Sequence, residues 1–325
     1  MASDHEPGVL TDAVGPDRPI SASLILPVDL CVAAYNLLLI GVWAPLVLTE
    51  PAARWMIGAH LAALALPFLL SNASRRGRAV AVLRDVYPVL WLCVFWKELG
   101  IHHSIVGSAA GDALVSRLDL RLFGGHPNLH WMPSMPALWF SELMHSFYFA
   151  YYPLVLLVPL MVIVRRGAEE RRDVLLRVTA AYLTCFSVYA VLPAAGPMHT
   201  LPVYSGDLVN GLFYQLTHLA RQGGDALGTA FPSSHVVGAV TSAWLTCRYW
   251  GGWQGKAATL TAVMIGLATV YTQNHFLVDA VSGALIALTL HNLVIPRTSA
   301  REVPSAISPG RTELPPLGAA RQAAG

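Results

Sequence analysis

Apolar residues in this chain gather into long runs, separated by short polar segments, from about residue 24 to residue 296. Many of the runs approach the roughly 20 residues that an α-helix needs to cross a bilayer. The pattern predicts eight spans, at about 24–48, 54–71, 86–104, 137–164, 174–193, 234–250, 257–274 and 276–296. We therefore predict an all-α, polytopic integral membrane protein.

The composition agrees with this fold class. Of the 325 residues, 55% are hydrophobic and only 12% are charged, which excludes an ordinary soluble domain. A net charge of +2 gives no reason to expect a nucleic-acid partner. The four cysteines all fall inside apolar runs, so we expect them to pack in the helices rather than form disulfides.

The distribution of positive charge predicts the orientation. The connections after the second, fourth and sixth spans are short and basic, and with both terminal segments they hold 16 of the 21 Lys and Arg residues. By the positive-inside rule both termini are cytoplasmic, and the even number of spans agrees. The long segments 105–136 and 194–233 then face outward. We expect a bacterial plasma membrane, although a eukaryotic secretory membrane with a lumenal site would obey the same rule.

The two ends of the chain differ from the apolar region. Residues 1–23 are polar and lack the pattern of a cleavable signal, so they are predicted to be a cytoplasmic tail. Residues 297–325 are rich in Pro, Ala, Gly and Arg and are predicted to be a disordered cytoplasmic tail.

Two histidine motifs are predicted to meet at the outer face. The sixth span opens with Phe231-Pro-Ser-Ser-His-Val-Val-Gly238, and the seventh climbs back to end at Tyr271-Thr-Gln-Asn-His-Phe-Leu-Val-Asp279. One helix down and one helix up return His235 and His275 to the same side of the membrane. If the last segment is helical, Asp279 shares a helix face with His275.

These residue types suggest phosphoryl transfer. Asp279 near a bilayer needs a partner, and a carboxylate that holds one imidazole nitrogen of His275 leaves the other nitrogen as a base or nucleophile. His235 could then act as a general acid toward a leaving group. Ser233 or Ser234 is a good N-cap, and a helix N-terminus attracts an anion.

The two motifs together resemble the second and third signatures of the type 2 phosphatidic-acid phosphatase superfamily. Within it, the chain is most similar to the branch of inositol-phosphorylceramide synthases and their bacterial relatives. The supporting segments are Leu118-Asp-Leu-Arg-Leu-Phe-Gly-Gly-His-Pro127, Phe147-Tyr-Phe-Ala-Tyr-Tyr152 and Leu192-Pro-Ala-Ala-Gly-Pro197. The resemblance covers residues 86–296, a six-helix membrane domain, and residues 24–85 add two further helices.

The resemblance implies a mechanism. His275 would attack phosphorus and form a phosphohistidine, Asp279 would orient it, and His235 would protonate the leaving group. The substrate would be a membrane lipid, and a lipid, a small alcohol or water would accept the phosphoryl group. No cofactor or metal is required.

The chain also departs from the superfamily pattern. The Ser-Arg pair expected before the last motif is replaced by Ala268 and Thr269, and Lys97 does not complete the first motif, Lys-x6-Arg-Pro. The missing arginines would clamp a phosphate, so transfer of a phospho-head-group between lipids is favoured and lipid phosphate hydrolysis is the alternative. Lys97 or Arg221 could supply the positive charge instead.

Other polar residues have competing interpretations. His145, one turn from Glu142, could contact the head group or form an internal polar pair. His199 is interpreted as a loop residue, and its position near the site makes phosphate binding the alternative. The charges of residues 112–121 are read as the ordinary surface of an interfacial helix.

A second class of function rests on the number of histidines. Nine of the 12 map to the outer side, which would suit a metal-binding or transport protein, but the spacing shows no metal-ligand pattern. The chain also lacks the internal repeat of many transporters and the Gly-x-Ser-x-Gly nucleophile of a serine hydrolase.

Overall fold

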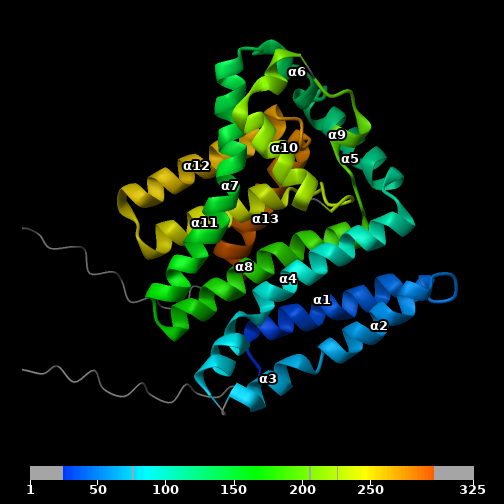
Figure 1. Cartoon of the computed structure of the whole chain (residues 1–325), viewed down its shortest axis with the longest axis vertical. Coiled ribbons are helices and arrows are strands. Elements are labelled where there is room, and N and C mark those ends of the chain that lie inside the picture. The colour runs from blue at the N-terminus through cyan, green and yellow to red at the C-terminus, as the bar shows by residue number, and fades with distance from the viewer. Residues whose placement is uncertain (1–24, 75–76, 205, 225, 296–325) are drawn as a thin grey trace, which may run out of the picture. The chain divides into compact units, whose positions relative to one another are not determined.

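The computed structural model describes residues 25–74, 77–204, 206–224 and 226–295. In these ranges the regular elements are helices, and the one isolated β-bridge joins Ala194 to Thr229 (Figure 1). The all-α prediction is therefore confirmed. The two predicted cytoplasmic tails, 1–23 and 297–325, lie outside the described residues. The chain divides into two compact units, Met1–Tyr87 and Pro88–Gly325.

The first unit contains α1 (Pro27–Trp43), η1 (Ala44–Leu46), α2 (Pro51–Ala63), α3 (Leu66–Ser74) and the start of α4 (Arg78–Val106). Proline opens α1 and α2, where its missing N–H removes no helical hydrogen bond. A buried ion pair ties α1 to α4: Arg84 Nη1 donates to Asp29 Oδ1 at 2.9 Å, and the Tyr87 hydroxyl donates to the same oxygen at 2.6 Å. The pair compensates a charge that would be costly in an apolar helix.

The second unit follows α4 with nine helices and two short helical segments in the part of the chain that is described. They are α5 (Ala109–Phe123), α6 (Pro127–Ser134), α7 (Leu138–Arg165), α8 (Ala168–Val191), α9 (Pro197–Thr200), η2 (Asp207–Asn210), α10 (Leu212–Gly224), α11 (Ser234–Tyr249), α12 (Gly252–Tyr271), α13 (Leu277–Thr289) and η3 (Leu290–Val294).

Six stretches of the described residues are helical, long and apolar enough to cross a membrane. They are Pro27–Leu46, Pro51–Ser74, Ala79–Val106, Leu138–Arg165, Ala168–Val191 and Leu277–Val294. The predicted sixth and seventh spans, α11 and α12, are not among them. α11 has only 16 residues and carries several Ser, Thr and His side chains. That α11 and α12 also cross the membrane stays a prediction.

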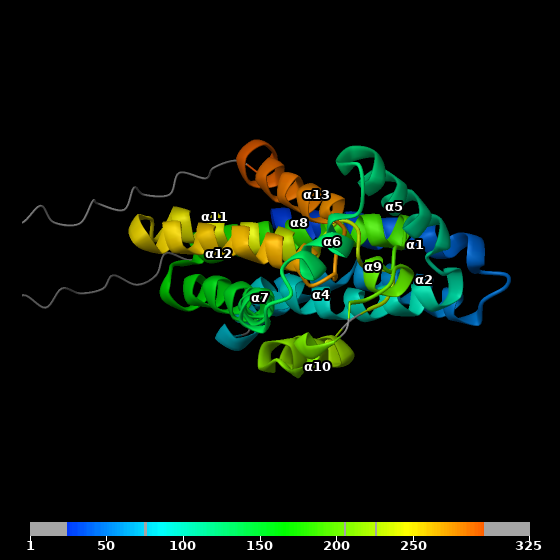
Figure 2. The ribbon, with the colours of Figure 1, turned by 90° about the horizontal axis from the view of Figure 1, so that it is seen from above.

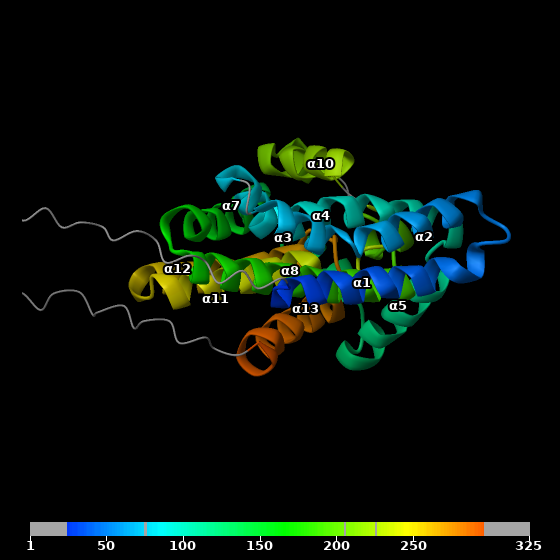
Figure 3. The ribbon, with the colours of Figure 1, turned by 90° about the horizontal axis from the view of Figure 1, so that it is seen from below.

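α11 is the central helix of the second unit. It packs against α7, α8, α12 and α13. Figures 2 and 3, drawn from opposite sides, place α11 and α12 between α13 and α7, with α10 outside α7. Glycines permit the close packing: a Cβ on Gly238 would lie 2.3 Å from the Tyr182 hydroxyl, and one on Gly255 would lie 3.0 Å from Cys247 Sγ. The polar side chains of α11 are thus covered by protein.

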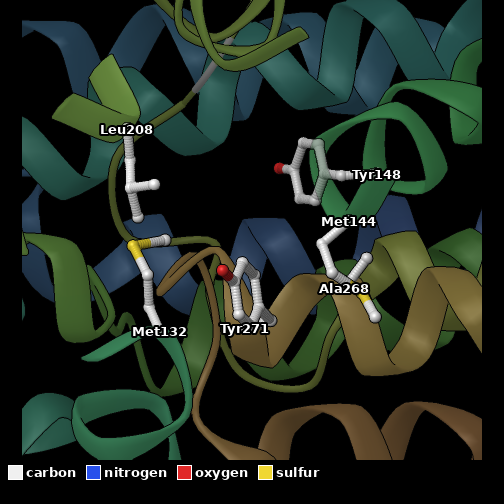
Figure 4. Packing of buried hydrophobic residues seen from close by; sticks show 6 residues of the cluster. All are labelled: Met132, Met144, Tyr148, Leu208, Ala268 and Tyr271. Carbon is white, nitrogen blue, oxygen red and sulfur yellow. The ribbon is translucent and has the colours of Figure 1, made fainter. Parts of the chain in front are cut away.

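A cluster of buried side chains holds the end of α6, the first half of α7 and the end of α12 together. It contains Met132, Met144, Tyr148, Leu208, Ala268 and Tyr271 (Figure 4). The Tyr271 hydroxyl also donates to the Met135 carbonyl at 2.9 Å. The cluster fixes Tyr148 on α7 and the end of α12, where the second histidine motif begins.

The segments between the long helices are hydrogen-bonded to one another. Ala194 pairs with the strand-like segment Gly228–Ala230 through two backbone hydrogen bonds, of 3.1 and 2.8 Å. Gly196, at φ +89°, donates its N–H to Asp112 Oδ1 at 3.0 Å, and a Cβ there would collide with Ala230. These contacts hold the segment Gly228–Ala230, which directly precedes the first histidine motif.

Candidate active site

The first motif forms a capped helix start. Ser233 is the N-cap of α11, and its Oγ accepts the Val236 N–H at 3.3 Å. The fully buried Tyr189 hydroxyl bridges the turn before it, donating to the Pro232 carbonyl at 2.5 Å and accepting the Ser234 N–H at 3.1 Å. His235 therefore begins α11 in a fixed orientation.

The second motif is a tight turn between α12 and α13. The Asn274 and His275 N–H groups both donate to the Thr269 carbonyl, at 3.1 and 3.0 Å. Gln273 takes a left-handed conformation, φ +58°, and its Oε1 accepts the Tyr204 N–H at 2.8 Å. The turn thus holds His275 just ahead of α13.

Asp279 faces His275 from the first turn of α13. Its Oδ2 accepts the Phe276 N–H at 2.9 Å and lies 3.4 Å from His275 Nδ1. His275 precedes α13, so the contact arises from the geometry of a helix start rather than from two positions one helical turn apart. A long contact of this kind is common in unliganded catalytic pairs. A proton on Nδ1 would face this carboxylate, and Nε2 would then keep its lone pair.

The two motifs meet directly. The Ser233 N–H donates to the Asp279 carbonyl at 3.0 Å, and the ring centroids of His235 and His275 lie 5.5 Å apart. Gly283 permits this approach, because a Cβ there would lie 2.6 Å from the Ser233 carbonyl oxygen. Two segments that lie 40 residues apart in the sequence thereby form one site.

His235 is surrounded by tyrosines of α7. The Tyr148 hydroxyl lies 3.1 Å from His235 Nε2, and the Tyr151 ring lies 4.3 Å from the imidazole, centroid to centroid. Tyr151 is held in turn by a 2.8 Å hydrogen bond to Tyr182. His235 Nδ1 is buried and has no hydrogen-bond partner among the described residues. Nε2 is therefore positioned by protein, and Nδ1 is enclosed without a partner among the described residues.

A small polar cavity of about 50 Å³ opens between the two histidines. It is lined by Trp96, Tyr148, Ala195, Met198, His199, Arg221, Ala226, Leu227, Thr229, Ala230, Ser234, His235, Asn274 and His275. A larger groove of about 490 Å³ lies at the other end of α11 and α12, and Lys256 is its only charged lining residue. The small cavity, with its convergent polar groups, is the better candidate for chemistry.

The structure brings some of the proposed phosphate-binding residues to this cavity and not others. Ser234, His199 and Arg221 line it, whereas Ser233 is fully buried as the N-cap beside it. Lys97 is exposed on α4 and does not line the cavity, although the adjacent Trp96 does.

His145 and Glu142 lie away from the cavity lining and have structural contacts. His145 is buried, with Nδ1 2.8 Å from the Ser141 carbonyl oxygen. Glu142 accepts the N–H groups of Phe213 and Tyr214, at 2.8 and 3.0 Å, and so caps the start of α10. This geometry favours the internal polar role over head-group contact.

Arg221 is the only Lys or Arg side chain that lines the cavity in the described residues. It also contacts Met198 Sδ. Burial lowers the pKa of His218, on the same helix, below its usual range, and its ring stacks on that of Tyr214 with the centroids 4.0 Å apart. At the positions of the missing Ser-Arg pair, Ala268 and Thr269 are fully buried.

Sequence reasoning missed several residues that build the site. Asp119, read as an ordinary surface charge, is fully buried and accepts the Val278 N–H at 3.0 Å. Asp112 and Tyr189 hold the segments around the first motif, and Tyr148 contacts His235. Only Asp119 and Tyr148 lay in segments that the resemblance had marked, and neither was assigned a role.

The histidines do not form a metal site in the described part of the chain. No group of three or more His, Cys, Asp or Glu side chains lies close enough there to hold a metal ion. This arrangement gives no support to the metal-binding alternative.

Of three comparisons with known proteins, one finds a match, and the matching family agrees with the geometry. A search of curated proteins and a search of solved structures find no match. The family model described as PAP2 superfamily matches residues 114–293, more than half of the chain, and the match includes both histidine motifs. Membership supports an activity of the phosphatase or phosphotransferase type on a phosphate ester. The chain belongs to the PAP2 superfamily.

Proposed function

We propose that this protein transfers a phosphoryl group or phospho-head-group from a membrane lipid through a phosphohistidine on His275. The observation that carries the proposal is the meeting of His235 with the His275–Asp279 pair at one small polar cavity. A nucleophile oriented by a third group, with an acid on the opposite side, is the arrangement that covalent catalysis needs.

In the first step, His275 Nε2 attacks phosphorus and the bond to the leaving oxygen breaks. His235 gives its proton to that oxygen, so the departing group leaves as an alcohol. In the second step, water or an acceptor alcohol attacks the phosphohistidine, and its proton returns to His235. His275 is regenerated. Asp279 stabilises the positive charge that His275 carries when phosphorylated.

The phosphate would be held at the start of α11. Ser233 and Ser234 place the helix N-terminus at the cavity, where the helix dipole favours an anion. Arg221 supplies a positive charge in place of the missing arginines, and His199 adds a hydrogen-bonding side chain. Lys97, the other candidate, is exposed and does not line the cavity.

Transfer between lipids, as in the inositol-phosphorylceramide synthase-like branch, is the preferred reaction. Among the described residues, the cavity is lined by a single arginine, whereas a phosphomonoesterase of the superfamily carries more. A phosphodiester has one negative charge fewer than a phosphomonoester, so fewer arginines are needed to neutralise it. Hydrolysis of a lipid phosphate is the second candidate, because water competes with an acceptor alcohol in any such site. We place the site at the extracytoplasmic face of a bacterial plasma membrane, with both termini cytoplasmic, on the positive-inside argument.

Lipid analysis of expressing membranes tests the proposal. Mass spectrometry would compare wild type with His275→Ala, and the purified proteins would be assayed on vesicles that contain phosphatidic acid or phosphatidylinositol. We expect wild type to change the lipid profile and His275→Ala to form no acid-labile phosphoenzyme. His235→Ala should lose about 10²- to 10⁴-fold in rate. An inactive wild type with an unchanged lipid profile would refute the proposal.

A matched pair of variants tests the source of the positive charge. Arg221→Met should raise KM for the lipid phosphate, because a cation that lines the cavity is lost. Lys97→Met should retain full activity, because that side chain is exposed. Loss of activity in Lys97→Met with a normal Arg221→Met would reverse the assignment.

A further inference from the structure

The first outer segment contributes a second pair of His and Asp side chains behind the site. Asp119, on α5, is fully buried, and its partner Val278 lies 159 residues further along the chain. Asp119 Oδ1 accepts the Val278 N–H at 3.0 Å, and Oδ2 lies 3.1 Å from His126 Nδ1. Both carboxylate oxygens therefore have partners.

The chain turns sharply after α5 to form this pair. Gly124 ends the helix in a left-handed conformation, φ +70°, which glycine adopts without strain. His126 then returns to Asp119, its ring lies 5.4 Å from that of Phe276, and Ser116 Oγ lies 3.4 Å from Nε2. The segment Leu118–Pro127 is thus built to place a carboxylate at the start of α13.

The first turn of α13 shares its N–H groups between two carboxylates. Asp279 Oδ2 takes the Phe276 N–H, and Asp119 takes the Val278 N–H. Asp279 Oδ1 is buried and has no hydrogen-bond partner among the described residues. If Asp119 were absent, the orphaned Val278 N–H would attract Asp279, because a carboxylate in the first turn bonds free N–H groups there. Asp279 would then turn away from His275.

We propose that Asp119, supported by His126, is a positioning residue for the reaction, which rests on the function proposed above. By occupying the Val278 N–H, it leaves the Asp279 carboxylate facing His275 Nδ1. It touches neither histidine of the site, and it acts through the first turn of α13. A buried carboxylate is costly near a bilayer, and the helix N-terminus together with His126 compensates that cost.

Kinetics of Asp119 variants test the assignment on the full-length protein in vesicles that contain phosphatidic acid or phosphatidylinositol. Asp119→Ala should lower kcat by about 10- to 100-fold, since small misplacements of a nucleophile have effects of this size, while KM stays within about threefold. The rate of phosphoenzyme formation should fall by the same factor. Asp119→Asn should recover most of the rate, because its Oδ1 still accepts from Val278. Arg117→Ala, an exposed change on the same helix, is the control.

A second variant and a set of contrary outcomes allow this test to refute the assignment. If Asp119→Ala does not fold, His126→Ala takes its place, and kcat should fall about three- to tenfold at unchanged KM. A raised KM at normal kcat, or wild-type kinetics in Asp119→Ala, would overturn the assignment. So would an Asn variant as slow as the Ala variant. Wild type that forms no phosphoenzyme would instead refute the proposed function itself.

Discussion

Substitution of Gly283 by Ala tests whether α13 and α11 approach as closely as the site requires. The new Cβ would lie 2.6 Å from the Ser233 carbonyl oxygen and 3.3 Å from Val236 Cβ. Ordinary contacts begin at 3.4 Å, so the two helix starts must separate by about 0.8 Å. Overpacking of this kind costs about 1–3 kcal/mol, partly offset by about 1 kcal/mol of better helix propensity. Because the obstructing atom belongs to the backbone, no side-chain rotation relieves the contact.

The effect on activity should exceed the effect on stability. A displacement approaching 1 Å between His275 and His235 lowers catalysis by up to about 100-fold. We would measure kcat on lipid vesicles and the unfolding temperature in detergent. Gly266→Ala is the matched control, because its Cβ would face the same Val236 at an unstrained 4.0 Å. A Gly283→Ala protein as active and as stable as Gly266→Ala would refute the reasoning.

Three further changes probe contacts outside the histidine motifs. Tyr148→Phe removes the hydroxyl beside His235 and should lower kcat about two- to tenfold with KM unchanged, as measured by steady-state kinetics; equal kinetics would dismiss this contact. Arg84→Met leaves Asp29 buried without its guanidinium and should destabilise the protein by about 3–5 kcal/mol in thermal unfolding. Replacing both members of that pair by apolar residues should restore most of the loss, and a double variant as unstable as the single one would contradict this. Glu142→Ala removes the cap of α10, the helix that carries Arg221, and should raise KM more than it lowers kcat. An unchanged KM would show that α10 does not contribute to substrate binding.

The sequence was sufficient to predict the helical class and the pairing of the two histidine motifs. Both follow from patterns that a single chain displays: long apolar runs, and a pair of consecutive helices, one on each side of a short turn, that brings His235 and His275 to the same end of the pair. The match of the PAP2 family model across both motifs supports the superfamily assignment. The interval between the motifs holds only one helical hairpin, α11 and α12, so few arrangements were possible.

The supporting residues could not be predicted, because their partners lie far away in the sequence. Tyr148 meets His235 across 87 residues, and Asp119 meets Val278 across 159. No local periodicity distinguishes such a carboxylate from a solvated charge. Similarly, the predicted span 54–71 became two helices, α2 and α3, a break that the apolar pattern does not reveal.

The adjoining starts of α11 and α13 differ in the charge that they present. Each helix carries about half a positive charge at its N-terminus. At α11 the N–H groups of Ser234 and Val236 are satisfied by hydroxyls, which leave that charge in place. At α13 they are satisfied by the carboxyl groups of Asp279 and Asp119, which oppose it. Of the two adjoining helix starts, that of α11 is therefore the one that favours an anion.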